Sequence, residues 1–237
     1  MDESYYLGAY WRARNESASE CAARAVTLFS LLPKVDPSLA QWFRQSKSRK
    51  DATKNPIASD HAELERRLRR TKDRHFEDLG FRLSGWNGAP EDADASSFDA
   101  AVGIYSEWVG NFWLFELPSR GPVAERLLTG KVLSELLRAT AIAWEPDWGV
   151  AMSHAHREMV GDRHVPKSPY VGGVTYLARH LGVVPPLPAP VRIEPVEDKG
   201  TLVILTPERF TASNPEHVAL AERVRELLDR AGLLKPL

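Results

Sequence analysis

The pattern with the clearest chemical potential is the run SHAHRE, which places His154, His156 and Glu158 at alternate positions. Side chains at alternate positions of a strand point to the same face. Two imidazoles and a carboxylate on one face can hold a catalytic zinc ion and leave one position open. The run therefore allows a metal-dependent hydrolase. The alternative is a polar strand edge or loop whose side chains bond to their neighbours.

A second candidate is an acidic stretch in which small residues separate the carboxylates. Its acidic residues are Glu91, Asp92, Asp94 and Asp99. Nothing around them predicts the apolar pocket that raises one carboxyl pKa for acid–base catalysis. We therefore interpret the stretch as a solvated loop between two strands.

A third candidate is the basic run from residue 44 to residue 54, RQSKSRKDATK. Its cations are Arg44, Lys47, Arg49, Lys50 and Lys54. Lysine and arginine neutralise phosphates, but binding to single strands also uses aromatic platforms, and none is interleaved here. A solvated surface is the simpler interpretation, and nucleic-acid binding is the alternative.

Other chemical motifs are missing from the sequence. The glycines match neither GxxxxGK[ST] nor GxGxxG, and the serines lack a GxSxG elbow. The single cysteine, Cys21, excludes an internal disulfide framework, and its place on an apolar helix face predicts a core residue. We expect no cofactor.

Composition narrows the choice of partners. The 237 residues include 31 basic and 32 acidic side chains, so a net charge of -1 gives no global field for nucleic acid or an anionic membrane. We find neither a secretory signal nor an apolar run long enough to span a membrane, and we expect a cytoplasmic protein. Seven tryptophans exceed what such a core needs, and this surplus favours a protein interface.

The first half of the chain predicts alternating strands and helices. Residues 5–11 form an aromatic strand, and the capping box of Ser17 and Glu20 starts a helix that Pro33 closes. A sparse apolar stripe from residue 61 to residue 80 predicts a surface helix. Residues 81–86, 98–108 and 111–118 then predict a three-stranded antiparallel meander whose last turn lies at residues 109–111.

The second half has the strongest helical signals. Residues 123–144 form the predicted central helix, which Gly130 can divide. Residues 191–205 predict a hairpin, and Asn214 caps a final amphipathic helix that Gly232 ends. We therefore predict an α+β fold with an antiparallel or mixed sheet flanked by helices, in one domain over residues 1–237 with one or two lobes.

Several blocks of the chain occur in a characteristic order. They begin with YYLGAYW and SASECAARA, continue through KSRKDA, GFRLSGWNG, EPDWGVAMSHAHRE and GGVTYLARH, and end with the segment from Val191 to Leu234. In these blocks and their order, the chain resembles the immunity protein 52 family. Residues 88–128 match the family pattern least.

This resemblance implies a non-enzymatic protein that binds and neutralises a bacterial toxin. Such toxins are often restriction-endonuclease-like nucleases, delivered by a type VI or contact-dependent route. A nuclease presents a basic groove, which an acidic protrusion would complement. We therefore expect the following residues to face the toxin: Glu91, Asp92, Asp94, Asp99, Trp86 and Trp108. The same residues in a solvated, mobile loop are the alternative.

Overall fold

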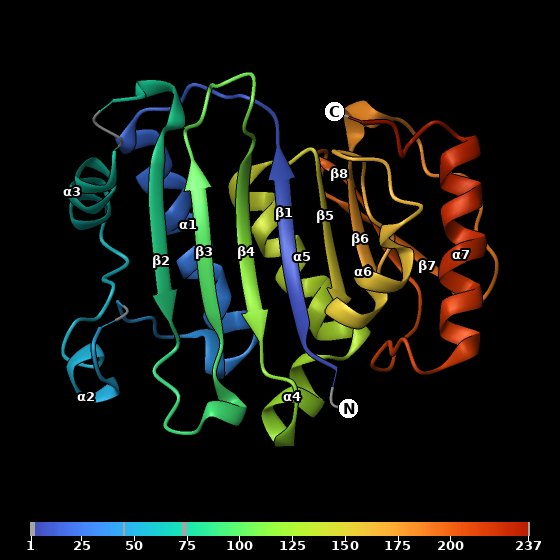
Figure 1. The fold of residues 1–237 in the computed structure, drawn as a ribbon, viewed down its shortest axis with the longest axis horizontal. Coiled ribbons are helices and arrows are strands. Elements are labelled where there is room, and N and C mark those ends of the chain that lie inside the picture. The colour runs from blue at the N-terminus through green and yellow to red at the C-terminus, as the bar shows by residue number, and fades with distance from the viewer. Residues whose placement is uncertain (1–2, 45, 73–74, 237) are drawn as a thin grey trace.

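The computed structural model describes residues 3–44, 46–72 and 75–236, and its centre is an eight-stranded antiparallel sheet (Figure 1). The strand order is β2-β3-β4-β1-β5-β6-β8-β7. The strands are β1 (Tyr5–Trp11), β2 (Phe81–Trp86), β3 (Ser97–Val102), β4 (Asn111–Leu117), β5 (Trp148–Ser153), β6 (Val174–Ala178), β7 (Arg192–Val196) and β8 (Gly200–Ile204). The predicted meander and closing hairpin are both present in it.

Seven α-helices in the described chain surround this sheet. They are α1 (Ala18–Val35), α2 (Arg49–Ala52), α3 (His61–Thr71), α4 (Gly121–Leu127), α5 (Gly130–Trp144), α6 (His154–Gly161) and α7 (Pro215–Arg230). The predicted α+β class is confirmed, and the sheet is antiparallel at every pairing of these strands. Among the described residues, no helix is both long and apolar enough to cross a membrane.

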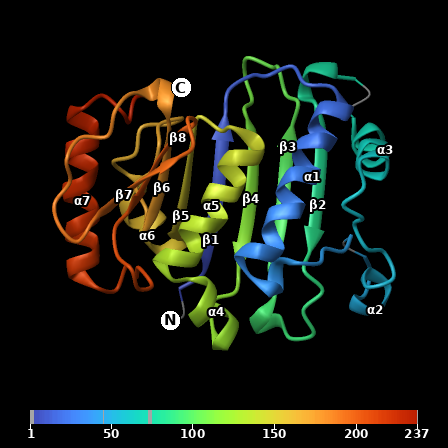
Figure 2. The same ribbon diagram turned by 180° about the vertical axis from the view of Figure 1, so that it is seen from behind.

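Helices α1 and α5 cover the back of the sheet (Figure 2). Side chains alternate between the two faces of each strand, so those on the back face pack with both helices in one core. Trp113 of β4 stacks on Trp144 of α5 at 5.1 Å between ring centroids and on Phe98 at 4.9 Å. The buried tryptophans are Trp11, Trp42, Trp113, Trp144 and Trp148. Most of the tryptophan surplus thus fills the core, contrary to the interface interpretation.

The front of the sheet is covered over only part of its width. Side chains of β5, β6 and β8 pack under the apolar stripe of α7, whose buried members include Ala221, Val224 and Leu228. In front of β2, β3 and β4, Figure 1 shows no helix. The residues of β2 accordingly alternate between buried and exposed or half-buried positions. The molecule therefore presents half of one sheet face to solvent.

Three predicted boundaries were wrong. Helix α1 continues through Pro33 to Val35. Proline lacks a backbone N–H, but here it lies in the last turn of the helix, where the loss is tolerated. The Asp36 side chain then caps the short turn that follows. Strand β3 ends at Val102, since Gly103 has φ +69° and the Asn111 amide pairs with Ile104. Residues 103–110 therefore form a long loop, which we call the tip loop. The helix predicted to residue 80 ends at Thr71.

Candidate functional site

The SHAHRE residues lie on helix α6 rather than on a strand, so the expected common face does not exist. The Ser153 hydroxyl accepts the His156 N–H at 3.1 Å and starts the helix. Positions two apart on a helix point in different directions. The His154 ring lies 4.9 Å from Tyr6, with Nε2 3.2 Å from a Glu116 carboxylate oxygen.

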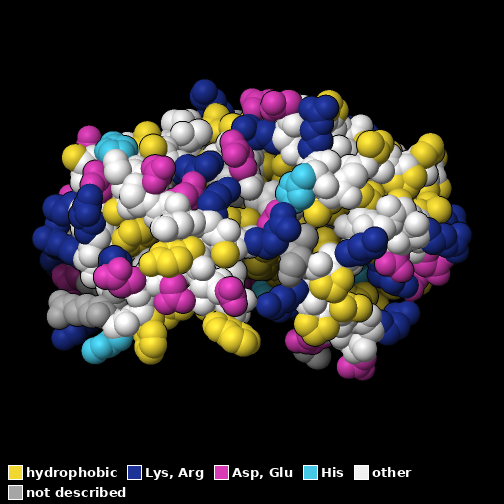
Figure 3. Space-filling view, turned by 90° about the horizontal axis from the view of Figure 1, so that it is seen from above, with side chains coloured by type: hydrophobic (Ala, Val, Ile, Leu, Met, Phe, Trp, Pro, Cys, Tyr) yellow, Lys and Arg dark blue, Asp and Glu magenta, His cyan; other side chains and the backbone are white. Residues whose placement is uncertain are grey.

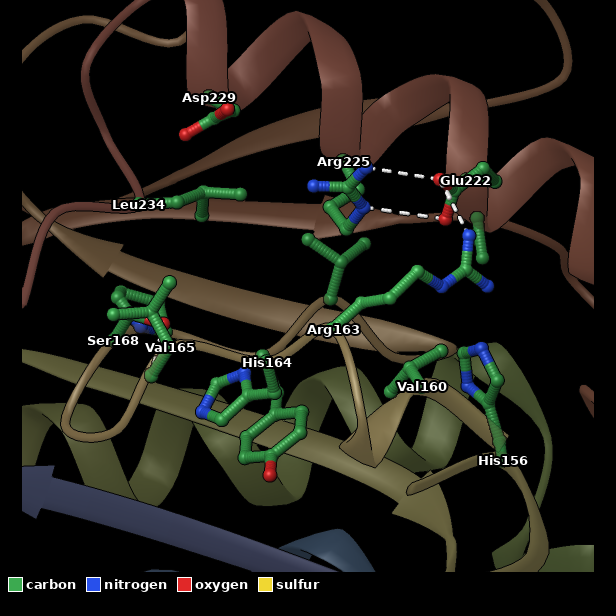
Figure 4. Close-up of a pocket in the computed structure, with 14 residues that line it drawn as sticks. His156, Val160, Arg163, His164, Val165, Ser168, Glu222, Arg225, Asp229 and Leu234 are labelled. Carbon is green, nitrogen blue, oxygen red and sulfur yellow. Dashed lines mark hydrogen bonds and ion pairs between the residues drawn. The ribbon is translucent and has the colours of Figure 1, made fainter. Parts of the chain in front are cut away.

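His156 instead lines a cavity of about 110 Å³ between α6 and α7 (Figure 4). Its ring is 1% exposed, and burial lowers its pKa, which keeps the imidazole neutral. Across the cavity, Glu222 pairs with both Arg163 and Arg225. Within the described residues, no three His, Cys, Asp or Glu side chains are placed to hold a metal ion. Of the three residues, only His156 is thus part of the packing between these helices, whereas His154 contacts the sheet and Glu158 is exposed.

The open half of the front face is the surface of the protein with most room for a partner. We call it the uncovered face, and define it by the front-facing residues of β2, β3 and β4. These are Arg82, Ser84, Trp86, Ser97, Asp99, Ala101, Phe112, Leu114 and Glu116. The Arg82 guanidinium lies over the Phe112 ring at 5.7 Å. The face therefore combines aromatic and aliphatic area with charges of both signs.

Of the six residues predicted to face a toxin, two belong to this uncovered face and four lie in the loops at its ends. Trp86 lies at the end of β2 beside the loop of residues 87–96, which we call the acidic loop and which carries Glu91, Asp92 and Asp94. Asp99 is exposed on β3 in the middle of the face. Trp108 lies in the tip loop at the opposite end, beyond a strand about 20 Å long. The structure therefore distributes these residues along the face instead of gathering them.

The acidic loop also contacts the basic run. Arg49 of α2 donates to the Pro90 carbonyl and forms an ion pair with Asp92, whose side chain is still 90% exposed. Trp86 joins the same region, because it exchanges two backbone hydrogen bonds with Phe43 at 2.9 and 2.7 Å. This end of the face is consequently a mixture of charges rather than a purely acidic protrusion.

The tip loop carries three exposed hydrophobic side chains close together in the sequence. Trp108 is 86% exposed, and its neighbours Tyr105 and Val109 are 39% and 44% exposed. Beside them lies a groove of about 410 Å³, floored by Tyr10 and Trp148, whose rings stack at 4.4 Å. Figure 3 looks onto this end of the sheet and shows hydrophobic side chains projecting at its border. Sequence reasoning found Trp108 but missed this groove, which needs three distant segments.

The fold is thus α+β, and half of one sheet face is left open beside the tip loop and the acidic loop. The model of the family "Immunity protein 52" matches residues 3–237, and the chain belongs to that family. Among solved structures, the Pseudomonas aeruginosa T6SS protein PA0821 is similar in fold, with a TM-score of 0.53 and 13% identity. The alignment covers 95% of this chain and 76% of that one. The comparison with curated proteins gives no match.

Proposed function

We propose that this immunity protein binds and neutralises a cognate toxin in the cytoplasm of the producing cell, by contact rather than by catalysis. The toxin is a restriction-endonuclease-like nuclease, delivered by a type VI or contact-dependent route. Family membership supports the toxin partner, and the fold similarity to a T6SS protein agrees with the route. No cofactor, nucleic acid or membrane takes part, and residues 1–237 act as one domain.

The toxin docks on the uncovered face. Its three strands, β2, β3 and β4, present about 14 Å by about 20 Å, or roughly 300 Å², to a partner. A stable interface buries about 800 Å² on each side. The loops at both ends of the face must therefore contribute. The residues that we assign to this contact are Glu91, Asp92, Asp94, Asp99, Trp86 and Trp108.

One observation carries the assignment: Trp108 is 86% exposed although five of the seven tryptophans are buried. Exposing an indole to water forgoes a large hydrophobic gain, and tryptophan is among the residues that dominate binding energy at interfaces. The acidic loop at the other end supplies charge that steers a basic nuclease groove. In this proposal, Trp108 contributes binding energy and the acidic loop speeds association.

Charge reversal of the acidic loop tests the electrostatic half of this proposal. The triple variant Glu91→Lys, Asp92→Lys, Asp94→Lys should weaken toxin binding and reduce or invert its salt dependence, because salt then screens a repulsion instead of an attraction. The measurements are binding of purified toxin at several salt concentrations and rescue of toxin-expressing cells. A control with the same change of net charge, on the far side of the molecule, combines Asp198→Lys, Glu208→Lys and Glu226→Lys. Unchanged affinity and salt dependence in the test variant would refute the role of the acidic loop.

A further inference from the structure

Strand β2 is an edge strand, and its outer edge is closed at two places. At Arg82, the Thr71 hydroxyl accepts the backbone N–H at 3.0 Å and donates to the carbonyl at 2.7 Å. At Trp86, both backbone groups pair with Phe43. Backbone groups of alternate residues in an antiparallel strand point to the same side. The N–H and C=O of Ser84 therefore also point outward, and among the described residues no partner meets them.

The backbone of Ser84 lies at a hollow of about 170 Å³ beside α3. Figure 1 shows α3 next to β2. The lining includes Arg44, Arg67 and Arg70 with Ser84. Figure 3 shows lysine and arginine side chains gathered at this end of the molecule. We call this hollow the arginine pocket.

The cations of the arginine pocket are only partly compensated. Arg67 donates Nε to Glu63 at 2.6 Å and Nη2 to the Pro56 carbonyl at 3.0 Å, but its buried Nη1 has no partner in the described chain. Glu63 is shared with Arg66. The side chains of Arg44 and Arg70 are exposed and form no ion pair with any described residue. The pocket thus has net positive charge and unused guanidinium donors.

We infer that the arginine pocket binds one acidic residue of the toxin, with its carboxylate on the arginines and its backbone on Ser84. A guanidinium offers a carboxylate two parallel hydrogen bonds. A phosphate group would match the arginines equally well, but it has no N–H for the outward carbonyl of Ser84. A peptide residue supplies both a donor and an acceptor, as in strand addition at a sheet edge.

The closed positions on either side limit this contact to one residue. Thr71 and Phe43 occupy the edge at Arg82 and Trp86, so a longer toxin strand cannot pair along β2. This arrangement protects an edge that would otherwise invite nonspecific strand pairing. The remaining contact requires a carboxylate at the arginines and, at the same time, a backbone aligned with Ser84. This double requirement favours a single partner.

The inference rests on the proposed function, and matched variants separate the two. Replacing Arg70 by Ala should weaken binding of the purified cognate toxin on the order of tenfold, and Arg44→Ala with Arg70→Ala about a hundredfold. Arg69→Ala is the control, since Arg69 is on the same helix but pairs with Glu65 outside the pocket. Thermal unfolding of each variant checks that the fold is retained.

A second pair of variants tests the backbone contact. Ser84→Pro removes the outward N–H without removing a bond to β3, because proline is tolerated at sheet edges. It should weaken toxin binding on the order of tenfold more than Ser84→Ala does, because Ser84→Ala removes the same hydroxyl from the uncovered face but keeps the N–H. The affinity is measured by titration calorimetry with the same toxin.

Three results would overturn the inference. If wild type and the double arginine variant bind the toxin equally well, the pocket is not part of the interface while the proposed function stands. If the isolated protein binds a 20-base-pair DNA duplex and the double variant does not, the ligand is a phosphate. If wild type binds no toxin, the proposed function fails and this inference with it.

Discussion

The two halves of the front face belong to one sheet but have different surroundings. On one half, Trp148, Val150 and Met152 of β5 are at most 6% exposed, because α6, the chain between α6 and β6, and α7 form one apolar cluster with them. On the other half, Phe112 and Leu114 of β4 remain half-buried, with no helix in front of them. An immunity protein needs a free surface for its toxin. We therefore interpret the covered half as the scaffold and the uncovered half as the binding region.

The sequence carries a signal for this difference. Strand β5 reads WGVAMS and is buried at every position, which is typical of a strand covered on both faces. Strand β2 reads FRLSGW and alternates between buried and accessible positions, as a strand with one solvated face does. The alternation of residue types along a strand therefore indicates whether one or both of its faces are buried. It does not reveal which element provides the cover.

The largest expected effect comes from disrupting the helix that covers the scaffold half. Val224 is fully buried on the inner side of α7, so Val224→Asp places an unpaired carboxylate in an apolar core and should destabilise the protein by about 4 kcal/mol or more. Protection from the toxin should be lost through unfolding. Urea denaturation measures the stability, and Arg223→Asp on the exposed side of the same helix is the control. A folded Val224→Asp protein that fails only in toxin binding would place α7 in the interface.

A pair of tryptophans compares the two halves directly. Trp148 is 6% exposed on the covered half, and Trp148→Ala should cost about 3–5 kcal/mol of unfolding free energy. Trp108 is 86% exposed, so Trp108→Ala should change the stability by less than about 0.5 kcal/mol. The same substitution at Trp108 should weaken toxin binding by about 2 kcal/mol. If Trp108→Ala destabilised the fold as Trp148→Ala does, the tip loop would be a structural element.

Much of the fold could be predicted because its signals are local. The capping box at Ser17, the break at Gly130, and the cap at Asn214 each depend on a few neighbouring residues, and all three are present. The SHAHRE prediction failed for a local reason as well. Ser153 can end a strand or cap a helix, and here it does both, so the histidines follow the helical period.

The candidate site could be predicted only in part, because its assembly depends on distant segments. The groove beside Trp108 needs Tyr10, Phe112 and Trp148, which come from three strands. The pairing of Arg49 with Asp92 joins the basic run to the acidic loop across 43 residues of chain. Spacing along the chain does not encode either contact. The six predicted residues keep their proposed role, but the uncovered face between them was found only in three dimensions.

We expect pH to have a smaller effect on stability, through the packing between α6 and α7. Burial lowers the pKa of His156, partly opposed by the carboxylates of Glu3 and Glu222. The unfolded chain, with an ordinary pKa near 6.5, then binds more protons than the native state, so stability should fall as pH drops below about 7. Urea denaturation at pH 7.5 and 5.5 measures this change. His156→Leu should reduce the loss, because it removes the imidazole that must take up the proton. An unaltered pH dependence in His156→Leu would contradict a buried neutral ring.

The smallest effect concerns helix α1, which packs on the back of the sheet behind the uncovered face. If a toxin is to dock on the front of β2, β3 and β4, helix α1 must hold their back side firmly. Cys21 is a fully buried probe of that cover, and burial raises the pKa of its thiol to about 12. Because only thiolates react rapidly, an aromatic disulfide reagent at pH 8 should modify Cys21 only as fast as the protein opens. Urea-unfolded protein is the positive control. Rapid labelling of the native chain would mean that α1 detaches readily, and the uncovered half would then be a loosely held surface rather than a preformed one.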